Sequence, residues 1–280
     1  MMSISLDSEN NTDPDYSDHY VAFLDVLGFS ELTRRADADP AWRAFLRQSI
    51  KILNETMPRE VERTGFRFTQ FSDSIVMSAA MTLDGLSIII QGCQLLTHNL
   101  LGSGVLLRGG IAAGKLHHDA QMLFGAGLLD AYEFERRGGP PHISLSQAVV
   151  DVLYLARLPV GTPNLVREDP WDLTPMLHTL ADFESYDGVP RVGGAILDRK
   201  AVHIAAMIQH YATDMSMLPS VRAKWRWQQD YWNRSVAVVG LLARSEQRAD
   251  WNELAQRSDE ETRRRTEQYN RDHPPKSGDG

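Results

Sequence analysis

Two stretches of the sequence decide the expected fold: YVAFLDVLGFS, residues 20–30, and FSDSIVMSA, residues 71–79. Both contain apolar runs typical of buried strands, and each holds one carboxylate, Asp25 or Asp73. Between them, a long segment from Ser30 to Arg63 has the apolar spacing of a helix. The ordered part of the chain is therefore expected to begin with a strand, a turn and a helix.

The following segments complete a βαββαβ order. They are a strand pair at Phe66–Phe71 and Ser74–Ala80, an amphipathic helix at Leu86–Leu101 and a strand at Val105–Ala113. In a ferredoxin-like sheet this order places the third strand antiparallel beside the first. The hairpin turn then lies at the end of the first strand, which brings Asp25 next to Asp73. We expect an α+β fold with a ferredoxin-like core and an antiparallel sheet.

The segments outside this core have different compositions. We expect disordered tails at 1–18 and 271–280, a proline-punctuated connector at 158–198, and a C-terminal helical extension at 199–270. The extension contains helix-like spacing at 201–244 and 252–268, with a break at Pro219. A helical annex is therefore expected to pack on the core.

Composition limits the classes of partner. The chain has 280 residues, of which 42% are apolar, and a formal net charge of -8. An acidic chain is a poor ligand for nucleic acid or anionic lipid, and a polyanionic substrate would need a metal. Cys93 is the only cysteine, which excludes an intrachain disulfide and indicates a reducing compartment. The sequence has no signal-peptide pattern and no apolar run of membrane-helix length, so we expect a cytoplasmic protein.

The two carboxylates suggest a metal site. Burying unpaired carboxylates is costly, so a converging pair favours a bound cation. Hard oxygen ligands beside a phosphate suit Mg²⁺ or Mn²⁺. The amides of Leu27, Gly28 and Phe29, at the start of the expected helix, could bind a triphosphate. The alternative is that Asp25 and Asp73 only cap a helix or a turn.

Four blocks of sequence carry a resemblance to a known family. They are FLDVLGFS at 23–30, FSDSIVMSA at 71–79, LLRGGIAAGKL at 106–116 and LFGAGLLDAYEFE at 123–135. Their order resembles the class III nucleotidyl cyclases, and more closely the pyrimidine cyclases of bacterial Pycsar antiphage systems. KWRWQQDYWN at 224–233 is similar to the helical extension of that family. The resemblance implies a nucleotidyl cyclase catalytic domain at 19–157.

The resemblance implies a role for several positions. Asp25 and Asp73, with the Val26 carbonyl, would bind two Mn²⁺ or Mg²⁺ ions per active site, and Phe29 and its neighbours would hold the triphosphate. Thr69 and Met122 stand where purine cyclases carry charged base-reading residues, which fits a pyrimidine base held by uncharged groups. Leu129 and Glu133 stand where purine cyclases carry the Asn and Arg that stabilise the transition state, so the resemblance implies that this pair is missing.

Two basic residues could supply the missing positive charge. Arg108 could bind a phosphate or a base carbonyl in a fork geometry, or form a buried structural ion pair instead. Lys115 could bind the triphosphate, or it could simply be solvated. Members of the family work as homodimers with composite sites. Thr69, Arg108 and Met122 could therefore act on the nucleotide held by the aspartates of the partner.

The favoured hypothesis is a uridylate cyclase, which makes 3′,5′-cyclic UMP from UTP in antiphage defence and acts through a separate effector protein. CTP is the alternative substrate, since the residues do not separate uracil from cytosine. A catalytically silent module that binds nucleotide or a protein partner is a second alternative. We expect no nucleic acid and no membrane as partners.

Three other signals compete with this interpretation. GGIAAGK at 109–115 fits the start of a P-loop, but Leu116 stands where a metal-binding Ser or Thr belongs. The residues His117 to Asp119 could suggest a metal cluster, although a polar hairpin turn is favoured. The tryptophans of 224–233 could stack on single-stranded nucleic acid, but their helical spacing favours aromatic anchors between the annex and the core or a second subunit.

Overall fold

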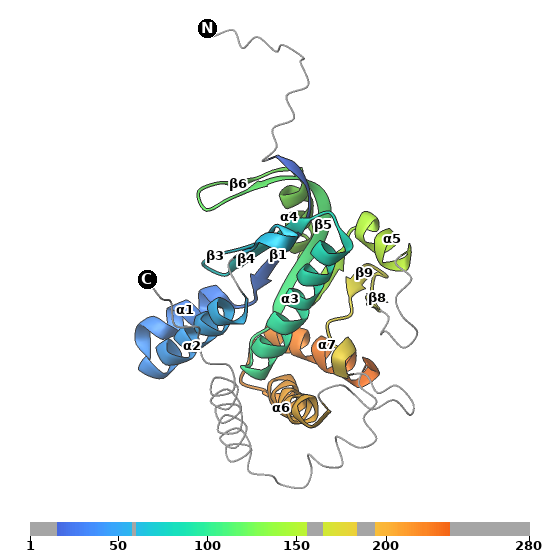
Figure 1. The fold of residues 1–280 in the computed structure, drawn as a ribbon. Helices are drawn as coiled ribbons and strands as arrows, with labels where there is room; N and C mark the ends of the chain where they lie inside the picture. Colours follow the sequence, from blue (N-terminus) through green and yellow to red (C-terminus); the bar gives the residue numbers. More distant parts are fainter. Residues whose placement is uncertain (1–15, 58–59, 156–164, 184–193, 236–280) are drawn as a thin grey trace, which may run out of the picture. The chain divides into compact units, whose positions relative to one another are not determined.

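The computed structural model describes residues 16–57, 60–155, 165–183 and 194–235 (Figure 1). These residues all fall within one compact unit of the chain, and the second unit, Val238–Gly280, lies outside them. Residues 1–15 of the expected tail at 1–18, the expected tail at 271–280 and the expected helix at 252–268 therefore lie outside the described residues. Ser17 and Asp18, which the expected tail included, instead begin the first strand. No helix in the described ranges is both long and apolar enough to cross a membrane.

The central strands have the order that the sequence predicts. They are β1 (Ser17–Val26), β3 (Phe66–Phe71), β4 (Ser74–Ala80) and β5 (Leu107–His118). They lie in the order β3-β4-β1-β5, and each neighbouring pair is antiparallel. This is the arrangement of a ferredoxin-like sheet, in which the second and third strands form a hairpin beside the first. The predicted α+β fold class is confirmed.

The long helix expected at Ser30–Arg63 is two helices. They are α1 (Phe29–Ala38) and α2 (Pro40–Thr56). The break falls at Asp39, whose carboxylate accepts a hydrogen bond from the Ala41 amide at 2.8 Å and so caps α2. Pro40 cannot donate to the preceding turn, so it can begin a helix but not continue one. After α2, β2 (Glu60–Val61) and a 3₁₀ turn (Glu62–Thr64) lead into β3.

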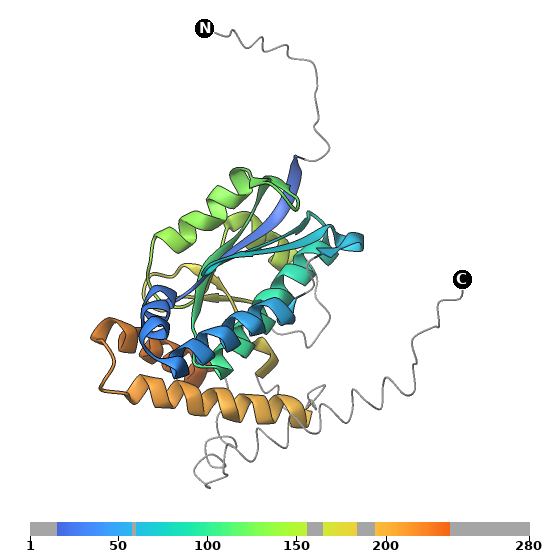
Figure 2. The same cartoon turned by 90° about the vertical axis from the view of Figure 1, so that its left-hand side faces the viewer.

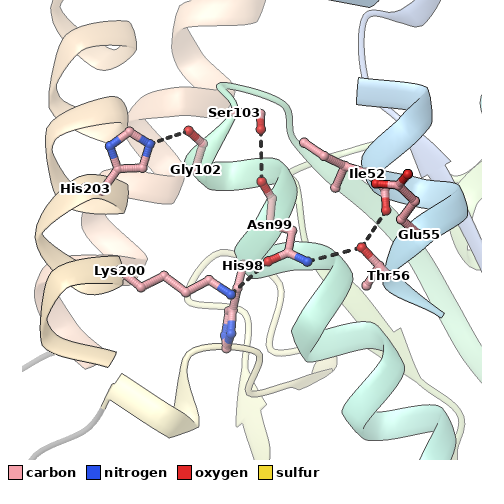
Figure 3. A pocket seen from close by; sticks show the side chains of 9 residues that line it. All are labelled: Ile52, Glu55, Thr56, His98, Asn99, Gly102, Ser103, Lys200 and His203. Carbon is pink, nitrogen blue, oxygen red and sulfur yellow. Dashed lines mark hydrogen bonds between the residues drawn. The ribbon is translucent and has the colours of Figure 1, made fainter. Parts of the chain in front are cut away.

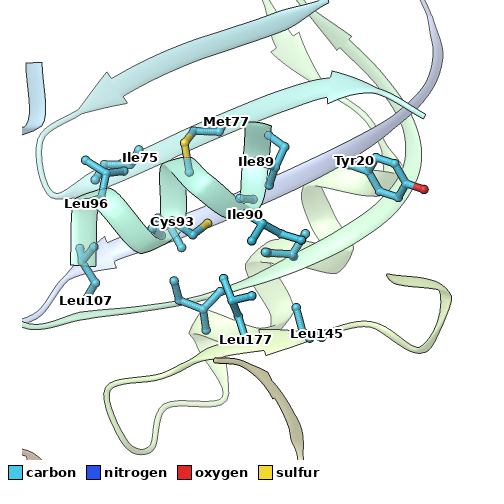
Figure 4. Close-up of a cluster of buried hydrophobic side chains, with 14 of the residues drawn as sticks. Tyr20, Ile75, Met77, Ile89, Ile90, Cys93, Leu96, Leu107, Leu145 and Leu177 are labelled. Atoms are coloured by element: carbon cyan, nitrogen blue, oxygen red, sulfur yellow. The ribbon is translucent and has the colours of Figure 1, made fainter. Parts of the chain in front are cut away.

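The two faces of the sheet are covered by different helices (Figure 2). Helix α3 (Leu83–Gly102) packs on one face and α4 (Ala126–Arg136) on the other. Successive side chains of a strand point to opposite faces. Accordingly Tyr20 (Figure 4), Ala22 and Leu24 join the α3 side of the core, and Val21 joins the α4 side.

Within the expected connector at 158–198, residues 165–183 add strands to the sheet and residues 194–198 begin a helix. Residues 166–168 and 175–177 form β8 (Val166–Glu168) and β9 (Pro175–Leu177), which follow β7 (Ile143–Leu145) at the edge beyond β5. Helix α5 (Gln147–Leu155) follows β7, and a 3₁₀ turn (Ala181–Phe183) follows β9. A proline is compatible with a strand at its first residue, where Pro175 lies. Of the described prolines, Pro170 therefore lies in a turn and Pro175 at the start of a short strand.

The helical annex begins as α6 (Gly194–Thr213) and α7 (Pro219–Ser235), with the expected break before Pro219. Its aromatic side chains are buried against the core. Trp227 lies 5.7 Å from the His142 ring, and Trp232 lies 5.6 Å from the Phe183 ring, centroid to centroid. The Tyr231 hydroxyl is hydrogen-bonded to the His178 ring at 2.7 Å. These rings anchor the annex to the core of the same chain and are not available for stacking on nucleic acid.

Strand β5 is longer than the Val105–Ala113 prediction. Residues 109–115 lie within it, which excludes the P-loop interpretation because that motif must lead from a strand into a helix. His117 and His118 end the strand and are buried, so the polar turn begins only at Asp119, before β6 (Leu123–Phe124). Because the two rings lie on opposite sides, they do not share an ion.

His118 fastens the end of β5 to the hairpin of β3 and β4. Its two ring nitrogens lie 2.9 Å from the Thr69 hydroxyl and 2.8 Å from the Ser78 hydroxyl. A neutral imidazole can donate to one hydroxyl and accept from the other. Burial, followed by the charge of Arg67, lowers the pKa of His118 to about 4.

This pKa predicts a loss of stability in acid. Between about pH 6.5 and pH 4 the unfolded chain takes up a proton on His118 that the folded chain excludes, so acidification favours unfolding. The free energy of unfolding, measured with urea, should fall between pH 7.5 and pH 5 by more in the wild type than in His118→Gln. The difference between the two losses should be on the order of 2 kcal/mol. Equal losses in the two proteins would show that His118 does not have this role.

Candidate active site

Asp25 lies on the α4 face of the sheet. It is the second-last residue of β1, two residues after Phe23 and four after Val21, which both pack on the α4 side. The alternation of side chains along a strand therefore directs Asp25 to the same face. Its side chain is 19% exposed, so the carboxylate is largely but not completely removed from solvent.

A two-residue hairpin turn brings Asp73 to this position. Phe71 and Ser74 are paired, and the turn residues between them are Ser72, with φ 57°, and Asp73. Asp25 pairs with Ser74 in the register of β1 and β4, and the Val26 amide donates to the Asp73 carbonyl at 2.9 Å. The structure thus brings Asp25 and Asp73 together at one end of the sheet, as the strand order predicts. Their roles as metal ligands remain predictions.

Arg108 enters the same site from β5. It is the register partner of Asp25, and its guanidinium lies 4.0 Å from the Asp25 carboxylate. The same guanidinium nitrogen donates to Glu135 of α4 at 2.5 Å. The Arg108 Nε atom is buried without a hydrogen-bond partner among the described residues. Arg108 therefore forms a largely buried ion pair, which was the alternative to ligand binding in the sequence analysis. It also lies close enough to Asp25 to reach a ligand bound there.

The site is crowded with negative charge. Burial raises the pKa of Asp25 to about 6, and the charges of Glu135 and Asp73 contribute in the same direction. Arg108 and Lys224 act against this rise but do not cancel it. A cation between the carboxylates would relieve the repulsion.

The donor set fits a hard divalent cation. Asp25 and Asp73 offer carboxylate oxygens, and the Val26 carbonyl follows Asp25 directly. Within the described ranges there is no cluster of three or more His, Cys, Asp or Glu residues suited to holding a metal. Mg²⁺ is commonly held by one or two carboxylates with substrate phosphates and water as its other ligands. Two carboxylates and a carbonyl are donors of the kind that such a metal uses when its other ligands come from a bound substrate and water.

The turn after β1 offers fewer amides than expected. Gly28, with φ 81°, precedes the first turn of α1, and no side chain caps that helix. The amides at its N-terminus can therefore face an anion. The Leu27 amide, however, donates to the Leu106 carbonyl at 2.9 Å. This bond holds β1 to the segment before β5, so Leu27 does not bind phosphate through its amide, whereas Gly28 and Phe29 remain candidates.

Lys115 does not reach the site of its own chain. It pairs with Asp18 in the register of β1 and β5, and its ammonium lies 3.2 Å from the Asp18 carboxylate. Arg108 lies seven residues earlier in β5, which corresponds to roughly 24 Å along an antiparallel strand. The expectation that Lys115 binds the triphosphate beside Asp25 is therefore wrong within one chain.

The two candidate base-binding residues lie near the β5–β6 hairpin. Thr69 is bound to His118, as described above, and Met122 closes the hairpin turn by accepting from the Asp119 amide at 2.9 Å. Met122 is 51% exposed. Both residues thus belong to the hairpin end of the sheet rather than to the immediate surroundings of Asp25. Their assignment to a base remains a prediction.

Two residues of the site were missed by the sequence analysis. Glu135 follows Ala131 by four residues on the helix face that packs on the sheet, and Lys224 precedes Trp227 by three residues in α7. Helical spacing relative to buried neighbours was the available signal in both cases. That spacing identifies the buried face of the helix. It does not identify the residues that this face contacts, because those are determined by tertiary packing.

A second polar cluster consists of Ser144, His142 and Asp169. The His142 ring lies 3.0 Å from Asp169 at one nitrogen and 3.0 Å from the Ser144 hydroxyl at the other. These are distances of a Ser-His-Asp triad, but Ser144 is only 5% exposed and Trp227 packs on His142. A nucleophile must be accessible to its substrate. The cluster therefore joins β7 to the β8–β9 hairpin as a structural connection.

A pocket of about 400 Å³ lies among α2, α3 and α6 (Figure 3). Its side chains link the three helices: Lys200 donates to Asn99 at 2.8 Å, and Asn99 donates to Thr56 at 3.1 Å. It is lined by Ile52, Glu55, Thr56, His98, Asn99, Gly102, Ser103, Lys200 and His203. Neither Asp25 nor Asp73 lines it, so this pocket is separate from the carboxylate site.

Comparisons with known proteins add a weak likeness of fold. No family model matches the sequence, and no curated protein matches it. Among solved structures the chain is similar to an adenylate/guanylate cyclase/hydrolase from Silicibacter pomeroyi, with 15% identity and a TM-score of 0.39. The match covers 58% of this chain and 94% of that chain. A likeness of this size does not define a function.

The crowding of carboxylates predicts a measurable effect of Asp25→Asn. The substitution removes a partly buried charge beside Glu135 and Asp73, so without metal it should raise the melting temperature, by roughly 2–4 °C per kcal/mol gained. Added Mn²⁺ should raise the melting temperature of the wild type and leave Asp25→Asn nearly unchanged.

Asp18→Asn is the matched control, since Asp18 lies on the same strand but pairs with Lys115. It should keep the response to Mn²⁺. A shift of the same size in the wild type and in Asp25→Asn would place the metal elsewhere.

Proposed function

We propose that the protein is a metal-dependent pyrimidine nucleotidyl cyclase that converts UTP to 3′,5′-cyclic UMP and pyrophosphate. The observation that supports this most is the meeting of Asp25 and Asp73 at the end of β1, with Arg108 opposite Asp25. In the reaction, the ribose 3′ hydroxyl gives its proton to water, and its oxygen bonds to the α-phosphorus. The bond from that phosphorus to the oxygen bridging to the β-phosphate breaks, and pyrophosphate leaves.

Each residue of the site has a part in this proposal. Asp25, Asp73 and the Val26 carbonyl would hold two Mn²⁺ or Mg²⁺ ions, which activate the attacking oxygen and neutralise the leaving pyrophosphate. The Gly28 and Phe29 amides would orient the triphosphate at the N-terminus of α1. Arg108 would exchange part of its pairing with Glu135 for the charge that develops at the α-phosphate.

The preference for a pyrimidine rests on the resemblance of the sequence to the Pycsar cyclases. Thr69 and Met122 are uncharged at the positions where purine cyclases carry charged base-reading residues. UTP is favoured because cyclic UMP is the commoner product in that family, and CTP is the alternative substrate. A catalytically silent nucleotide-binding module is the second candidate function, favoured by the pairing of Arg108 with Glu135.

The proposal includes a homodimer with composite active sites. Apolar side chains are exposed on the outer side of α4 and at the hairpin turns: Leu129 is 64% exposed, Phe71 81% and Met122 51%. Because Thr69 and Met122 lie away from Asp25 of their own chain, a second copy could bring them to the nucleotide. A mass near 31.5 kDa by light scattering, that of a single chain, would contradict the dimer.

The resemblance also suggests a cytoplasmic role in antiphage defence. The product would act as a second messenger on a separate effector protein. Cys93 is a free, buried thiol, which is compatible with a reducing compartment. Infected cells that produce the protein should accumulate cyclic UMP, and an unchanged nucleotide pool after infection would contradict this role.

The cyclase proposal is tested by incubating the purified protein with each of the four nucleoside triphosphates and Mn²⁺. Chromatography should show cyclic UMP from UTP, with less product from CTP in direct competition. Asp73→Ala should abolish turnover because it removes half of the carboxylate pair, whereas Asp18→Ala should keep the rate. Binding without pyrophosphate release from any nucleotide would favour the silent module, and an active Asp73→Ala would refute the metal assignment.

A further inference from the structure

Lys224 lies on the buried face of α7. Trp227, Gln228 and Tyr231 follow it by three, four and seven residues, and these three side chains are buried. Residues at these intervals share one face of a helix. Arg226, two residues after Lys224, is exposed on another side of the helix. A lysine on an inward face normally has an ionic partner or a ligand.

The contacts of α7 bring Lys224 to the carboxylate site. Trp227 packs on the His142 ring, and the His142 carbonyl accepts a hydrogen bond from the Gly109 amide at 3.1 Å. Gly109 directly follows Arg108 in β5. The helix therefore lies beyond the end of the sheet at which β1 ends and β5 begins (Figure 1). Lys224 is one helical turn before Trp227 and close enough to Asp25 and Arg108 for their charges to act on it.

Lys224 has no carboxylate partner among the described residues. Arg108 forms an ion pair with Glu135, and Lys115 forms one with Asp18. No carboxylate of the described residues lies within 4.0 Å of the Lys224 ammonium. Burial and the neighbouring Arg108 lower the pKa of Lys224, and Asp25 raises it. The ammonium is thus partly desolvated and lies beside the proposed metal ligands, with no fixed carboxylate partner in the part of the chain that the structure describes.

We propose that Lys224 is a substrate-binding residue that holds the phosphate chain of the nucleotide, so that the C-terminal helix is part of the active site. This inference rests on the proposed cyclase function. The ammonium would donate to non-bridging oxygens of the β- or γ-phosphate, the ligand chemistry that an unpaired lysine suits. Lys224 would thereby provide the cation that Lys115, seven residues after Arg108 in β5, does not provide within one chain.

The test compares Lys224→Met with Arg226→Met, a matched loss of one cation from the same helix. Inorganic tripolyphosphate, titrated by calorimetry in the presence of Mn²⁺, measures phosphate binding without any reaction. Lys224→Met should weaken its binding roughly tenfold to a hundredfold, as expected for a lost hydrogen bond between charged groups, and Arg226→Met should change it less than twofold. Lys224→Arg, which keeps the charge, should retain most of the affinity.

Nucleotide turnover separates this inference from the cyclase proposal. A wild type that cyclises UTP, combined with unchanged tripolyphosphate affinity and KM in Lys224→Met, would overturn the role of Lys224 and leave the cyclase proposal intact. A wild type that binds tripolyphosphate through Lys224 but cyclises no nucleotide would refute the cyclase proposal alone. Should Lys224→Met not fold, Lys224→Gln gives the same comparison, with unfolding curves as the check.

Discussion

The repulsion between carboxylates at one end of the sheet is the constraint on which the site depends. The register of β1 with β4 places Asp25 opposite Ser74 and next to the turn that carries Asp73. Neither Asp25 nor Asp73 belongs to the hydrophobic clusters of the core, and the proximity of the two acids costs free energy. Carboxylates held close together in this way are typical of functional sites, where a bound cation offsets the repulsion between them. The antiparallel strands β4, β1 and β5 hold this pair in place.

The helical annex and the added strands stabilise the same end of the molecule. Trp227 packs on His142, and His142 pairs with Asp169 in the turn between β8 and β9. Because these groups are buried, a substitution that loosens them would shift α7 and β7 together. The core therefore couples the positions of Lys224 and Arg108, although these two residues are 116 residues apart in the sequence.

The features that could be predicted from the sequence are those that depend on the spacing of neighbouring residues. Apolar runs predicted β1 and β4, and the break at Ser72 and Asp73 predicted the hairpin, so the meeting of Asp25 with Asp73 could be deduced. Strands β8 and β9 could not, because three residues are too few for a periodic pattern to emerge among prolines. The Leu27 amide, Glu135 and Lys224 depend on tertiary partners, which spacing alone does not specify.

The most direct test of the account is anomalous diffraction from crystals grown with Mn²⁺ and 3′-deoxy-UTP, an analogue that lacks the attacking oxygen. We predict two manganese peaks beside the triphosphate, with carboxylate oxygens of Asp25 and Asp73 at roughly 2.0–2.3 Å. Manganese bound elsewhere, or a triphosphate held without either aspartate, would contradict the central claim that these two side chains form a divalent metal site.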